Sequence, residues 1–420
     1  MDINKLLEGT QCSCGRQHTC DIKYVYIEKN AISRLDIICK DYSNLLLVAD
    51  ENTFSAAGHT VENVLNNKIS KKVIFSGKNI LVPDEKAIAE VTACTENIDL
   101  IIGIGSGVIQ DLCKYVSHFC NIPYVIVATA PSMDGYASDG AAMITDGMKV
   151  TYPAGLPLAI VSDTAVIKNA PMDMIVSGYG DIIGKFSALN DWKLSNTVND
   201  EYFCSYIYNL TYEQITRTID LANGILKRDE KSIAALMEAL VVIGILMSFA
   251  GSSRPASGSE HHLSHFFEIT GIVDKSPYLS HGTDVAYSTY ETAKVREKIL
   301  SMVFPAESYR QNAEDYKKTM HSLYKSSADG CIELQKKVGN YAKDRAAVYL
   351  EKENEIRSIL SEMPSSDYIK KLLSDVGLDT TDFYSFYGEE KIRNALLYAK
   401  DLKDRYTVLW MYYDFAAHKD

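Results

Sequence analysis

The stretch DLIIGIGSGVIQDLCKYVSHF, Asp99 to Phe119, decides the fold class of this chain. Its first part, DLIIGIGS, is an almost continuous apolar run, as in a parallel β-strand that is covered on both faces. Its second part, GVIQDLCKYVSHF, reads as a helix that begins directly after the glycines. Glycines at such a junction let the backbone approach a ligand, and the N–H groups of a helix start suit a pyrophosphate. The stretch therefore predicts one strand, loop and helix unit of an α/β domain.

Segments of the same two kinds lie on both sides of this stretch. Residues 51–67, ENTFSAAGHTVENVLNN, read as another helix, and short β-rich runs flank it. Further strands are predicted at 44–50, 71–77, 79–84, 124–131 and 156–163. This alternation predicts an α/β nucleotide-binding domain over residues 1–168.

The second part of the chain has a different pattern. From about Pro171 the strand signal ends, and helical periodicity in segments rich in Tyr, Leu, Ala, Glu and Lys continues to residue 420. Proline suits the first turn of a helix, so the boundary is expected just before Pro171. We predict an all-α domain over residues 169–420.

Composition and charge limit the functions that this chain can have. The chain has 420 residues, of which 46% are hydrophobic and 23% charged, as in a two-domain globular protein with a sizeable core. The net charge of −12 argues against a protein that grips nucleic acid, and no basic run offsets it. A small molecule is the expected partner.

The sequence also favours a cytoplasmic protein without a membrane span. Its most apolar stretch, residues 234–250, contains Glu238 and is shorter than the ~20 residues of a spanning helix, so a buried core helix is expected. The N-terminal residues show no signal-peptide pattern. The nine cysteines are scattered, which favours reduced thiols.

The segment CSCGRQHTC is the one place where cysteines gather. Cys12, Cys14, His18 and Cys20 are of the residue types that ligate zinc. However, Cys-x-Cys is tighter than the usual Cys-x2-Cys knuckle, and no second pair follows at a distance. The spacing therefore favours a small N-terminal hairpin with free thiols over a zinc site.

The glycine loop departs from the usual dinucleotide-binding fingerprint. It runs Gly-x-Gly-x-Gly from Gly103, and no acidic residue ends a strand about twenty residues later. The acidic strand end that does occur, Asp50, lies before the loop. An ordinary Rossmann dehydrogenase is therefore not expected, and taken alone the loop is also compatible with a plain tight turn.

The segment TAPSMDGYASDGA, residues 129–141, follows the next predicted strand. It is rich in small hydroxyl residues around Asp134. At the carboxyl end of a parallel strand, a loop of this kind lies where α/β sheets bind ligands. The alternative is a polar surface loop, and the residues alone do not separate the two.

The segment SGSEHHLSHFFE contains three histidines. In a helix through residues 258–268, His261 and His265 are four residues apart and share a face, whereas His262 is turned by about 100° from His261. A fourth histidine, His281, precedes a glycine and a helical run and can point toward the same space.

Asp181, within GYGDIIGKFSALNDW, can complete a metal site with these histidines. By itself it would be an N-cap or an exposed charge. An aspartate with two or three imidazoles suits Zn²⁺, Fe²⁺ or Ni²⁺ and leaves coordination positions open for substrate oxygens. The alternative is an accidental cluster of surface histidines. A cofactor loop and an open metal site together predict metal-assisted hydride transfer.

At these residues the chain resembles the glycerol-1-phosphate dehydrogenase family. This family lies within the superfamily of iron-containing alcohol dehydrogenases, glycerol dehydrogenase and dehydroquinate synthase. Four segments carry the resemblance: GIGSGVIQDLCKY, TAPSMDGYAS, GYGDIIGKFSALNDW, and GSSRPASGSEHHLSH followed by SHG. CSCG is also similar to an element near the start of bacterial members.

The resemblance implies a fold, a reaction and a set of site residues. The fold is an N-terminal α/β domain with an all-α C-terminal domain, and the reaction interconverts dihydroxyacetone phosphate and sn-glycerol 1-phosphate with NAD(P)H and one divalent metal ion (Zn, Ni or Fe). Asp181, His261 and His281 would hold the metal, while Asp134 and His265 would face the substrate, with Asp181 close to it. The cofactor pattern falls on Asp50, Gly105, Ser106, Gly107, Val108, Thr129, Ser132 and Ser138. A homodimer with a role in phospholipid metabolism is implied, and no functional residue is carried over beyond residue 300.

Three other functions stay open at this point. Arg254 and Lys185 favour a phosphorylated polyol substrate, but a dehydrogenase of the same fold could act on a polyol without phosphate, such as glycerol. A cyclase like dehydroquinate synthase would return the hydride within one cycle. A non-catalytic nucleotide sensor is the third alternative, although an Asp/His set fits catalysis better than a closed structural zinc site.

Overall fold

The computed structural model describes residues 3–145 and 148–416 of the chain. The chain forms two compact units. Unit 1 comprises Met1–Ile182 and Asp220–Ser252, and unit 2 comprises Ile183–Ile219 and Ser253–Asp420. The predicted domain boundary between residues 168 and 169 stays a prediction, because these units divide the second half of the chain differently.

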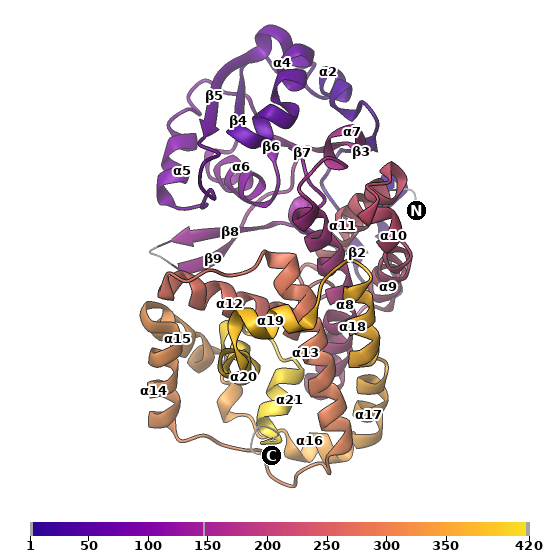
Figure 1. Cartoon of the computed structure of the whole chain (residues 1–420), viewed down its shortest axis with the longest axis vertical. Helices are drawn as coiled ribbons and strands as arrows, with labels where there is room; N and C mark the ends of the chain where they lie inside the picture. Colours follow the sequence, from indigo (N-terminus) through magenta and orange to yellow (C-terminus); the bar gives the residue numbers. More distant parts are fainter. Residues whose placement is uncertain (1–2, 146–147, 417–420) are drawn as a thin grey trace. The chain divides into compact units, whose positions relative to one another are not determined.

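Unit 1 is organised around a six-stranded sheet, of which Figure 1 labels every strand except β10. Each pair of neighbouring strands is parallel, in the order β3-β10-β7-β6-β4-β5. The strands are β3 (Tyr24–Glu28), β4 (Leu45–Asp50), β5 (Ile69–Phe75), β6 (Leu100–Gly105), β7 (Tyr124–Ala128) and β10 (Ala159–Asp163). Strand β5, which follows β4 in the chain, pairs with one side of β4, and the next strand, β6, pairs with its other side. The carboxyl ends of β4 and β6 therefore flank a topological switch point, where α/β sheets bind ligands.

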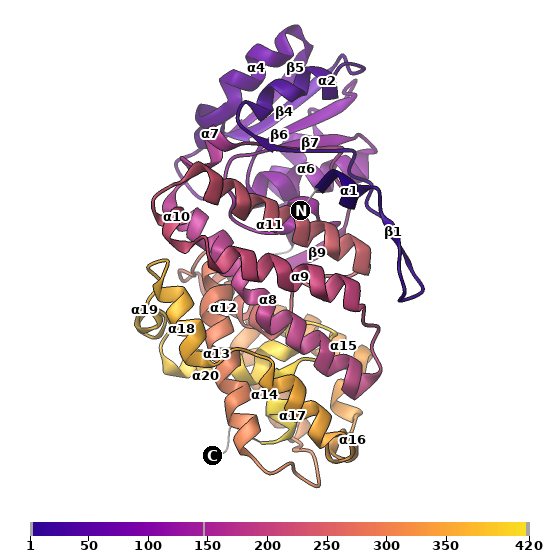
Figure 2. The same ribbon diagram turned by 90° about the vertical axis from the view of Figure 1, so that its right-hand side faces the viewer.

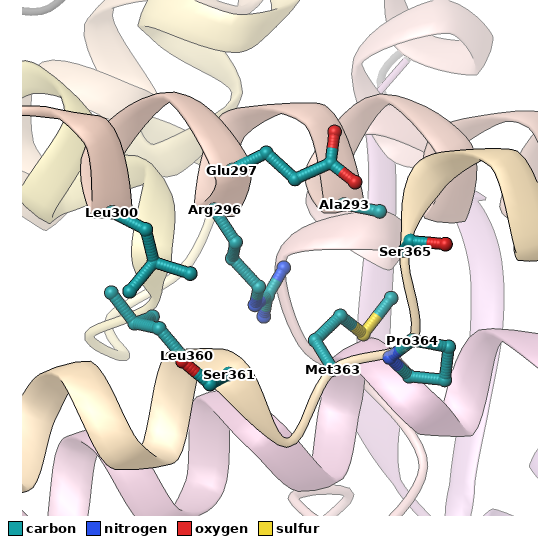
Figure 3. Close-up of a pocket in the computed structure, with 9 residues that line it drawn as sticks. All are labelled: Ala293, Arg296, Glu297, Leu300, Leu360, Ser361, Met363, Pro364 and Ser365. Carbon is teal, nitrogen blue, oxygen red and sulfur yellow. The ribbon is translucent and has the colours of Figure 1, made fainter.

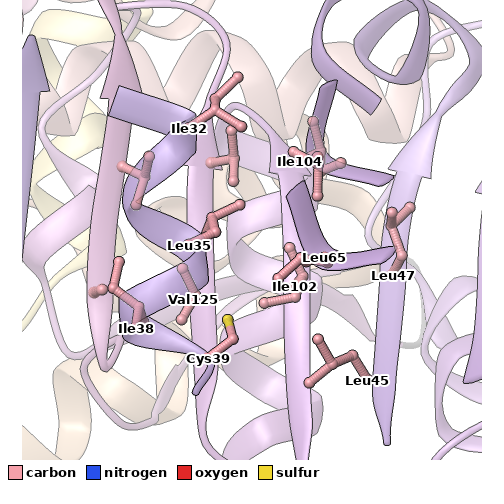
Figure 4. Packing of buried hydrophobic residues seen from close by; sticks show 14 of the residues in the cluster. Ile32, Leu35, Ile38, Cys39, Leu45, Leu47, Leu65, Ile102, Ile104 and Val125 are labelled. Atoms are coloured by element: carbon pink, nitrogen blue, oxygen red, sulfur yellow. The ribbon is translucent and has the colours of Figure 1, made fainter. Parts of the chain in front are cut away.

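Helices cover both faces of this sheet, which explains why its central strands are apolar on both sides. On one face Ile32, Leu35 and Ile38 pack against alternate residues such as Ile102 and Ile104, as Figure 4 shows. These side chains belong to η1 (Ala31–Arg34) and α2 (Leu35–Ile38), and α4 (His59–Leu65) adds to the same core. The other face is covered by α6 (Gly107–Cys120). The predicted α/β domain is thus confirmed.

Most of the predicted strands are present, and one is wrong. Residues 79–84 form no strand: Ile80 is 90% exposed, Pro83 has no N–H to donate, and Asp84 instead caps α5 (Glu85–Thr92) by accepting from the Ala87 N–H at 2.9 Å. A short apolar run without a buried face was misread as a strand. The predicted helix at 51–67 consists of α3 (Glu51–Thr53), a π-helical turn η2 (Phe54–Gly58), α4 and η3 (Asn66–Lys68).

Strand β3 and a second hairpin were not predicted from the sequence. Strands β8 (Gly140–Thr145) and β9 (Met148–Pro153) pair antiparallel. The dipeptide Asp146-Gly147 between them is a strong hairpin signal in the sequence. A smaller hairpin, β1 (Thr10–Gln11) with β2 (Gln17–His18), lies after α1 (Ile3–Leu7) and confirms the predicted N-terminal hairpin.

Helix α11 (Glu230–Ala250) of unit 1 is longer than the sequence analysis expected. By length and composition alone it could cross a membrane, with a mean hydropathy of 2.4, but 78% of its most apolar window is buried. The Asp229 side chain accepts from the Ser232 N–H at 2.9 Å and starts the helix before the apolar run. The helix contacts β3, α7 (Thr164–Ile167) and η4 (Gly135–Ala137), so it acts as a core helix of unit 1.

Among its described residues, unit 2 contains helices and the loops that join them but no strand, as predicted for this part of the chain. Helix α8 (Met172–Asn199) begins in unit 1 and continues into unit 2, where Figure 2 shows it beside α9 (Ser205–Ile219). The core of unit 2 includes Trp410, Tyr349 and Val295. The remaining helices are α10 (Ala222–Leu226, unit 1), α12 (Ser259–Asp274), α13 (His281–Ser301), α14 (Ala313–Tyr324), η5 (Lys325–Ser327), α15 (Ala328–Val338), η6 (Asn340–Ala342), α16 (Ala346–Glu351), α17 (Glu353–Ser361), α18 (Ser366–Ser374), α19 (Thr380–Tyr387), α20 (Glu389–Tyr398), η7 (Ala399–Leu402) and α21 (Val408–Asp414).

Candidate active site

A glycine allows helices α8, α12 and α13 to pack closely in unit 2. A Cβ atom added to Gly184 would lie 2.5 Å from Val285 Cγ1 and 3.4 Å from Glu260 Cγ. Three residues further along α8, the Ser187 hydroxyl lies 3.0 Å from the Ser259 hydroxyl of α12. Because α8 has no side chain at residue 184, the facing turns of α12 and α13 lie against it directly.

Asp181 lies on the same side of α8, one turn before Gly184. His261 and His281 each offer a ring nitrogen in unit 2, and Asp181, in α8 before the start of unit 2, is the carboxylate predicted to complete the ligand set. The set stays a prediction. One carboxylate oxygen and two imidazole nitrogens fit Zn²⁺, Fe²⁺ or Ni²⁺ and leave coordination positions open.

The three histidine rings gather in unit 2. The His261 and His281 ring centroids are 5.1 Å apart, and the His265 centroid lies 6.4 Å from His261 and 5.8 Å from His281. His262 is fully buried outside this group, and neither of its ring nitrogens has a hydrogen-bond partner among the described residues. Burial, together with the positive charge of Arg405, holds its pKa well below the usual value. His262 is therefore a neutral core residue.

Glu260 fixes the orientation of the His261 ring. Its side chain is fully buried, and Oε1 lies 2.7 Å from His261 Nδ1 and accepts from the Gly258 N–H at 2.8 Å. Burial by itself would raise the pKa of Glu260, but the hydrogen bond from His261 outweighs it and the pKa is lowered. The carboxylate accepts, so the His261 proton sits on Nδ1 and Nε2 carries the lone pair. Metal-ligating histidines are held in this way.

The loop after β7 reaches Asp181 within unit 1. The Asp134 N–H donates to Asp181 Oδ2 at 3.0 Å. Two glycines let the loop lie close to its neighbouring helices: a Cβ on Gly178 of α8 would overlap the carbonyl oxygen of Pro131, and a Cβ on Gly244 of α11 would lie 2.9 Å from the Asp134 carbonyl oxygen. Asp134 is buried, and its catalytic role stays a prediction.

The predicted cofactor residues lie along the carboxyl edge of the sheet in unit 1. Asp50 ends β4, Gly105 ends β6, and the Thr129 N–H that follows β7 donates to the Gly105 carbonyl at 3.1 Å. Helix α6 starts at Gly107, and its N-cap residue Ser106 makes no side-chain capping bond in the described structure. The first N–H groups of α6 are thus available to an anion at the switch point.

The polar side chains at this edge also serve the local structure. Asp50 Oδ1 caps α3 by accepting from the N–H groups of Asn52 at 2.8 Å and Thr53 at 3.0 Å. The Ser138 hydroxyl accepts from Lys114 Nζ at 3.2 Å. The Ser132 side chain is buried. Cofactor binding by these three side chains therefore stays a prediction, as it does for Val108, a half-buried residue in the first turn of α6.

Arg254 has a structural role that the sequence analysis did not expect. Its guanidinium is buried and donates to both carboxylate oxygens of Glu201, to the Tyr406 carbonyl at 2.9 Å and to the Ser195 hydroxyl at 3.2 Å. These bonds use all three of its nitrogen atoms, so Arg254 no longer supports a phosphate-bearing substrate. Lys185 is fully buried and lies one turn after Asp181 on α8.

A pocket of about 320 Å³ in unit 2 lies apart from the candidate residues (Figure 3). Its wall includes Arg296 and Glu297 of α13 and Pro364 before α18. Arg296 donates to Asp191 at 2.8 Å, and Glu297 accepts from Ser366 at the start of α18. Arg296 therefore stabilises the helical core and Glu297 the start of α18, and the pocket contains none of the predicted site residues.

Comparisons with known proteins place this fold in a class. Residues 26–171 match the family model described as "Iron-containing alcohol dehydrogenase". The chain is also similar to the crystal structure of an archaeal alcohol dehydrogenase from a Red Sea brine pool, with a TM-score of 0.61 and 13% identity over 96% of this chain and 94% of that chain. The fold is that of the iron-containing alcohol dehydrogenases, a class that implies a nucleotide cofactor and a metal ion.

Two relatives narrow the class to a family. A glycerol-1-phosphate dehydrogenase of Halalkalibacterium halodurans is 29% identical over 96% of this chain and 95% of its own length. Another from Geobacillus stearothermophilus is 33% identical over 68% of this chain and 74% of its own length. The chain belongs to the glycerol-1-phosphate dehydrogenase family. The resemblance inferred from its motifs is confirmed, and the protein is an oxidoreductase.

Proposed function

We propose that this protein interconverts dihydroxyacetone phosphate and sn-glycerol 1-phosphate, using NAD(P)H and one divalent metal ion (Zn, Ni or Fe). The observation that carries the proposal is the pair of histidine rings, His261 and His281, whose centroids lie 5.1 Å apart in unit 2 of a chain whose relatives are glycerol-1-phosphate dehydrogenases. A homodimer in the cytoplasm is part of the proposal.

Asp181, His261 and His281 are the proposed metal ligands. A metal ion bound by them would supply a Lewis acid for the carbonyl or carbinol oxygen of the substrate. The chain prepares two of the ligands in advance: Glu260 keeps the proton of His261 on Nδ1, and the Asp134 N–H holds Asp181 Oδ2. Both contacts orient a ligand before the ion arrives, which lowers the cost of ordering the site.

His265 is the proposed proton donor for ketone reduction. Reduction needs one proton at the substrate oxygen in addition to the hydride that a nicotinamide supplies. His265 belongs to the histidine group without being a proposed ligand. Its Nδ1 lies 3.9 Å from Glu268 Oε2. In the reverse direction the same ring would accept the proton. The buried Asp134 carboxyl group is the second proposed catalytic group beside the substrate.

The cofactor is proposed to bind at the carboxyl edge of the sheet. The N–H groups of the loop from Gly105 to Val108 and the start of α6 suit the pyrophosphate. The Asp50 carboxylate is suited to ribose hydroxyls, because Oδ1 makes both capping bonds and Oδ2 makes neither. Thr129, Ser132 and Ser138 lie on the neighbouring loop and are proposed to contact the nicotinamide half.

Lys185 supports the phosphorylated substrate over the free polyol. It lies four residues after Asp181 on α8 and therefore on the same side of the helix. A buried ammonium group next to a metal site suits a phosphate dianion. A glycerol dehydrogenase activity stays the second candidate, because Arg254, the other cation considered, is used in the core.

The experiment compares substrates directly. The full chain is purified with Zn²⁺ or Ni²⁺, and oxidation of NADH and of NADPH is followed with dihydroxyacetone phosphate, with dihydroxyacetone, and without substrate. We expect sustained turnover with the phosphorylated ketone and at least tenfold less with the free ketone. Turnover with dihydroxyacetone alone would support the glycerol dehydrogenase instead, and no turnover with either would remove the proposal.

A further inference from the structure

The N-terminal hairpin of unit 1 gathers ligands of a second kind. Strands β1 and β2 are joined by a tight turn, in which the Gly15 N–H donates to the Cys12 carbonyl at 3.0 Å and the Cys12 N–H donates to the Arg16 carbonyl at 3.1 Å. Gly15 has a φ of +86°, which favours glycine. The turn places Cys12 and Cys14 at the same end of the hairpin as His18.

The His18 ring is prepared as a metal ligand. It is fully buried, and its Nδ1 lies 2.9 Å from the Phe249 carbonyl oxygen. A carbonyl oxygen can only accept, so Nδ1 carries the proton and Nε2 carries the lone pair. Nε2 lies 3.5 Å from Cys14 Sγ. A backbone carbonyl bound to Nδ1 is a common way to fix the tautomer of a metal-ligating histidine.

The separations within the hairpin suit a tetrahedral ion. With Zn–S of ~2.3 Å and Zn–N of ~2.0 Å, two ligands at a tetrahedral angle lie about 3.5 Å apart. The Cys14–His18 separation has this value. A thiol–imidazole hydrogen bond would explain that pair alone, but the ligand atoms of Cys12, Cys14 and His18 all lie within 4.8 Å of one another. A third soft ligand in the group points to an ion.

We propose that Cys12, Cys14 and His18 bind a structural zinc ion. All three ligands belong to unit 1 and to one short hairpin. Two thiolates and one imidazole are ligands that zinc prefers in structural sites. The ion stabilises a hairpin whose strands have only two residues each, too short to be stable by pairing alone.

The fourth cysteine-motif residue, Cys20, is not part of this set. Cys20 is buried and does not belong to the group whose ligand atoms lie within 4.8 Å of one another. The internal spacing of CSCGRQHTC did not favour a zinc site. Spacing rules do not show that the hairpin turn brings two thiols and an imidazole together. The zinc site shares no residue with the proposed active site and does not depend on its reaction.

The experiment counts metal ions and identifies their ligands. The full-length His261→Ala variant, which is expected to lack the active-site metal, is loaded with Co²⁺ in place of zinc. We expect one bound Co²⁺ per chain, with a thiolate-to-cobalt charge-transfer band in the near ultraviolet, which carboxylate and imidazole ligands do not produce. The wild-type chain should bind two ions and show the same band. A His261→Ala protein without this band would overturn the proposal, with no cysteine variant needed.

Cysteine variants in the same background then assign the ligands. Cys12→Ser and Cys14→Ser should each lower the affinity for Co²⁺ at least tenfold and weaken the band. Cys94→Ser, at a half-buried cysteine outside the group, is the matched control and should leave both unchanged. Circular dichroism checks that each variant is folded. An unchanged band in folded Cys12→Ser would overturn the assignment of that ligand.

Discussion

The carboxyl edge of the sheet in unit 1 and the histidine group of unit 2 present different chemical groups to a ligand. At the sheet edge the side chains are engaged locally: Asp50 caps a helix, and Ser138 bonds Lys114. The edge therefore presents mainly backbone N–H groups at the start of α6. In the histidine group the side chains themselves meet, and a neighbour such as Glu260 serves to orient them.

This difference separates two kinds of mutational effect. A site made of backbone groups depends on the turn and the helix start, so a side chain can change if the local geometry is kept. A site made of converging side chains loses its chemistry when one of them is removed. Substitutions at the two places should therefore differ in both size and kind.

The largest effect is expected for His261→Ala. The change removes one of the proposed ligands and leaves Glu260 buried without its hydrogen-bond partner. Loss of an outer partner alone typically costs 10–100-fold in metal affinity, so loss of a ligand should exceed about 100-fold and abolish turnover. Metal analysis after gel filtration and an NAD(P)H assay measure the two losses. Full retention of active-site metal would show that the ligand set is wrong.

His262→Ala is the matched control for that variant. From helical phase alone, a change at His262 would be expected to have little effect. However, the ring is fully buried, so the expected effect is larger. Metal content should be unchanged, while the free energy of unfolding should fall by roughly 1–3 kcal/mol. Urea denaturation measures the difference.

A smaller effect is expected for Gly184→Ala. The new Cβ would lie 2.5 Å from Val285 Cγ1, so α13 must move away from α8. Overpacking of this kind costs about 1–3 kcal/mol, and the shift should also weaken metal binding. Gly330→Ala in α15 is the control, because nothing lies within 4 Å of its Cβ and alanine should add up to about 1 kcal/mol there. Urea midpoints should move in opposite directions, and two equal shifts would contradict the packing argument.

The parts of this molecule that follow local rules could be predicted from sequence. The central strands are apolar runs, and the 3.6-residue period separates His262 from His261 and His265. The rest depends on contacts between distant segments. No local pattern indicates that Gly184 faces Val285. Likewise, the run at 79–84 has the composition of a strand, but among the described residues it pairs only through a single bridge, between Asp84 and Ile144 of β8.

The smallest but most discriminating effect is expected for Asp50→Asn at the sheet edge. Asparagine caps a helix about as well as aspartate, so the change should leave stability within about 0.5 kcal/mol. If the carboxylate also binds the ribose hydroxyls, its loss should raise KM for NADH roughly tenfold, because hydrogen bonds to a charged group contribute about 1.5–3 kcal/mol. KM for NADPH should rise less, since a carboxylate disfavours the 2′-phosphate. Steady-state kinetics with both cofactors measures the ratio. Equal KM values for variant and wild type would leave Asp50 as a helix cap alone, and the sheet edge would then bind its ligand through backbone groups only.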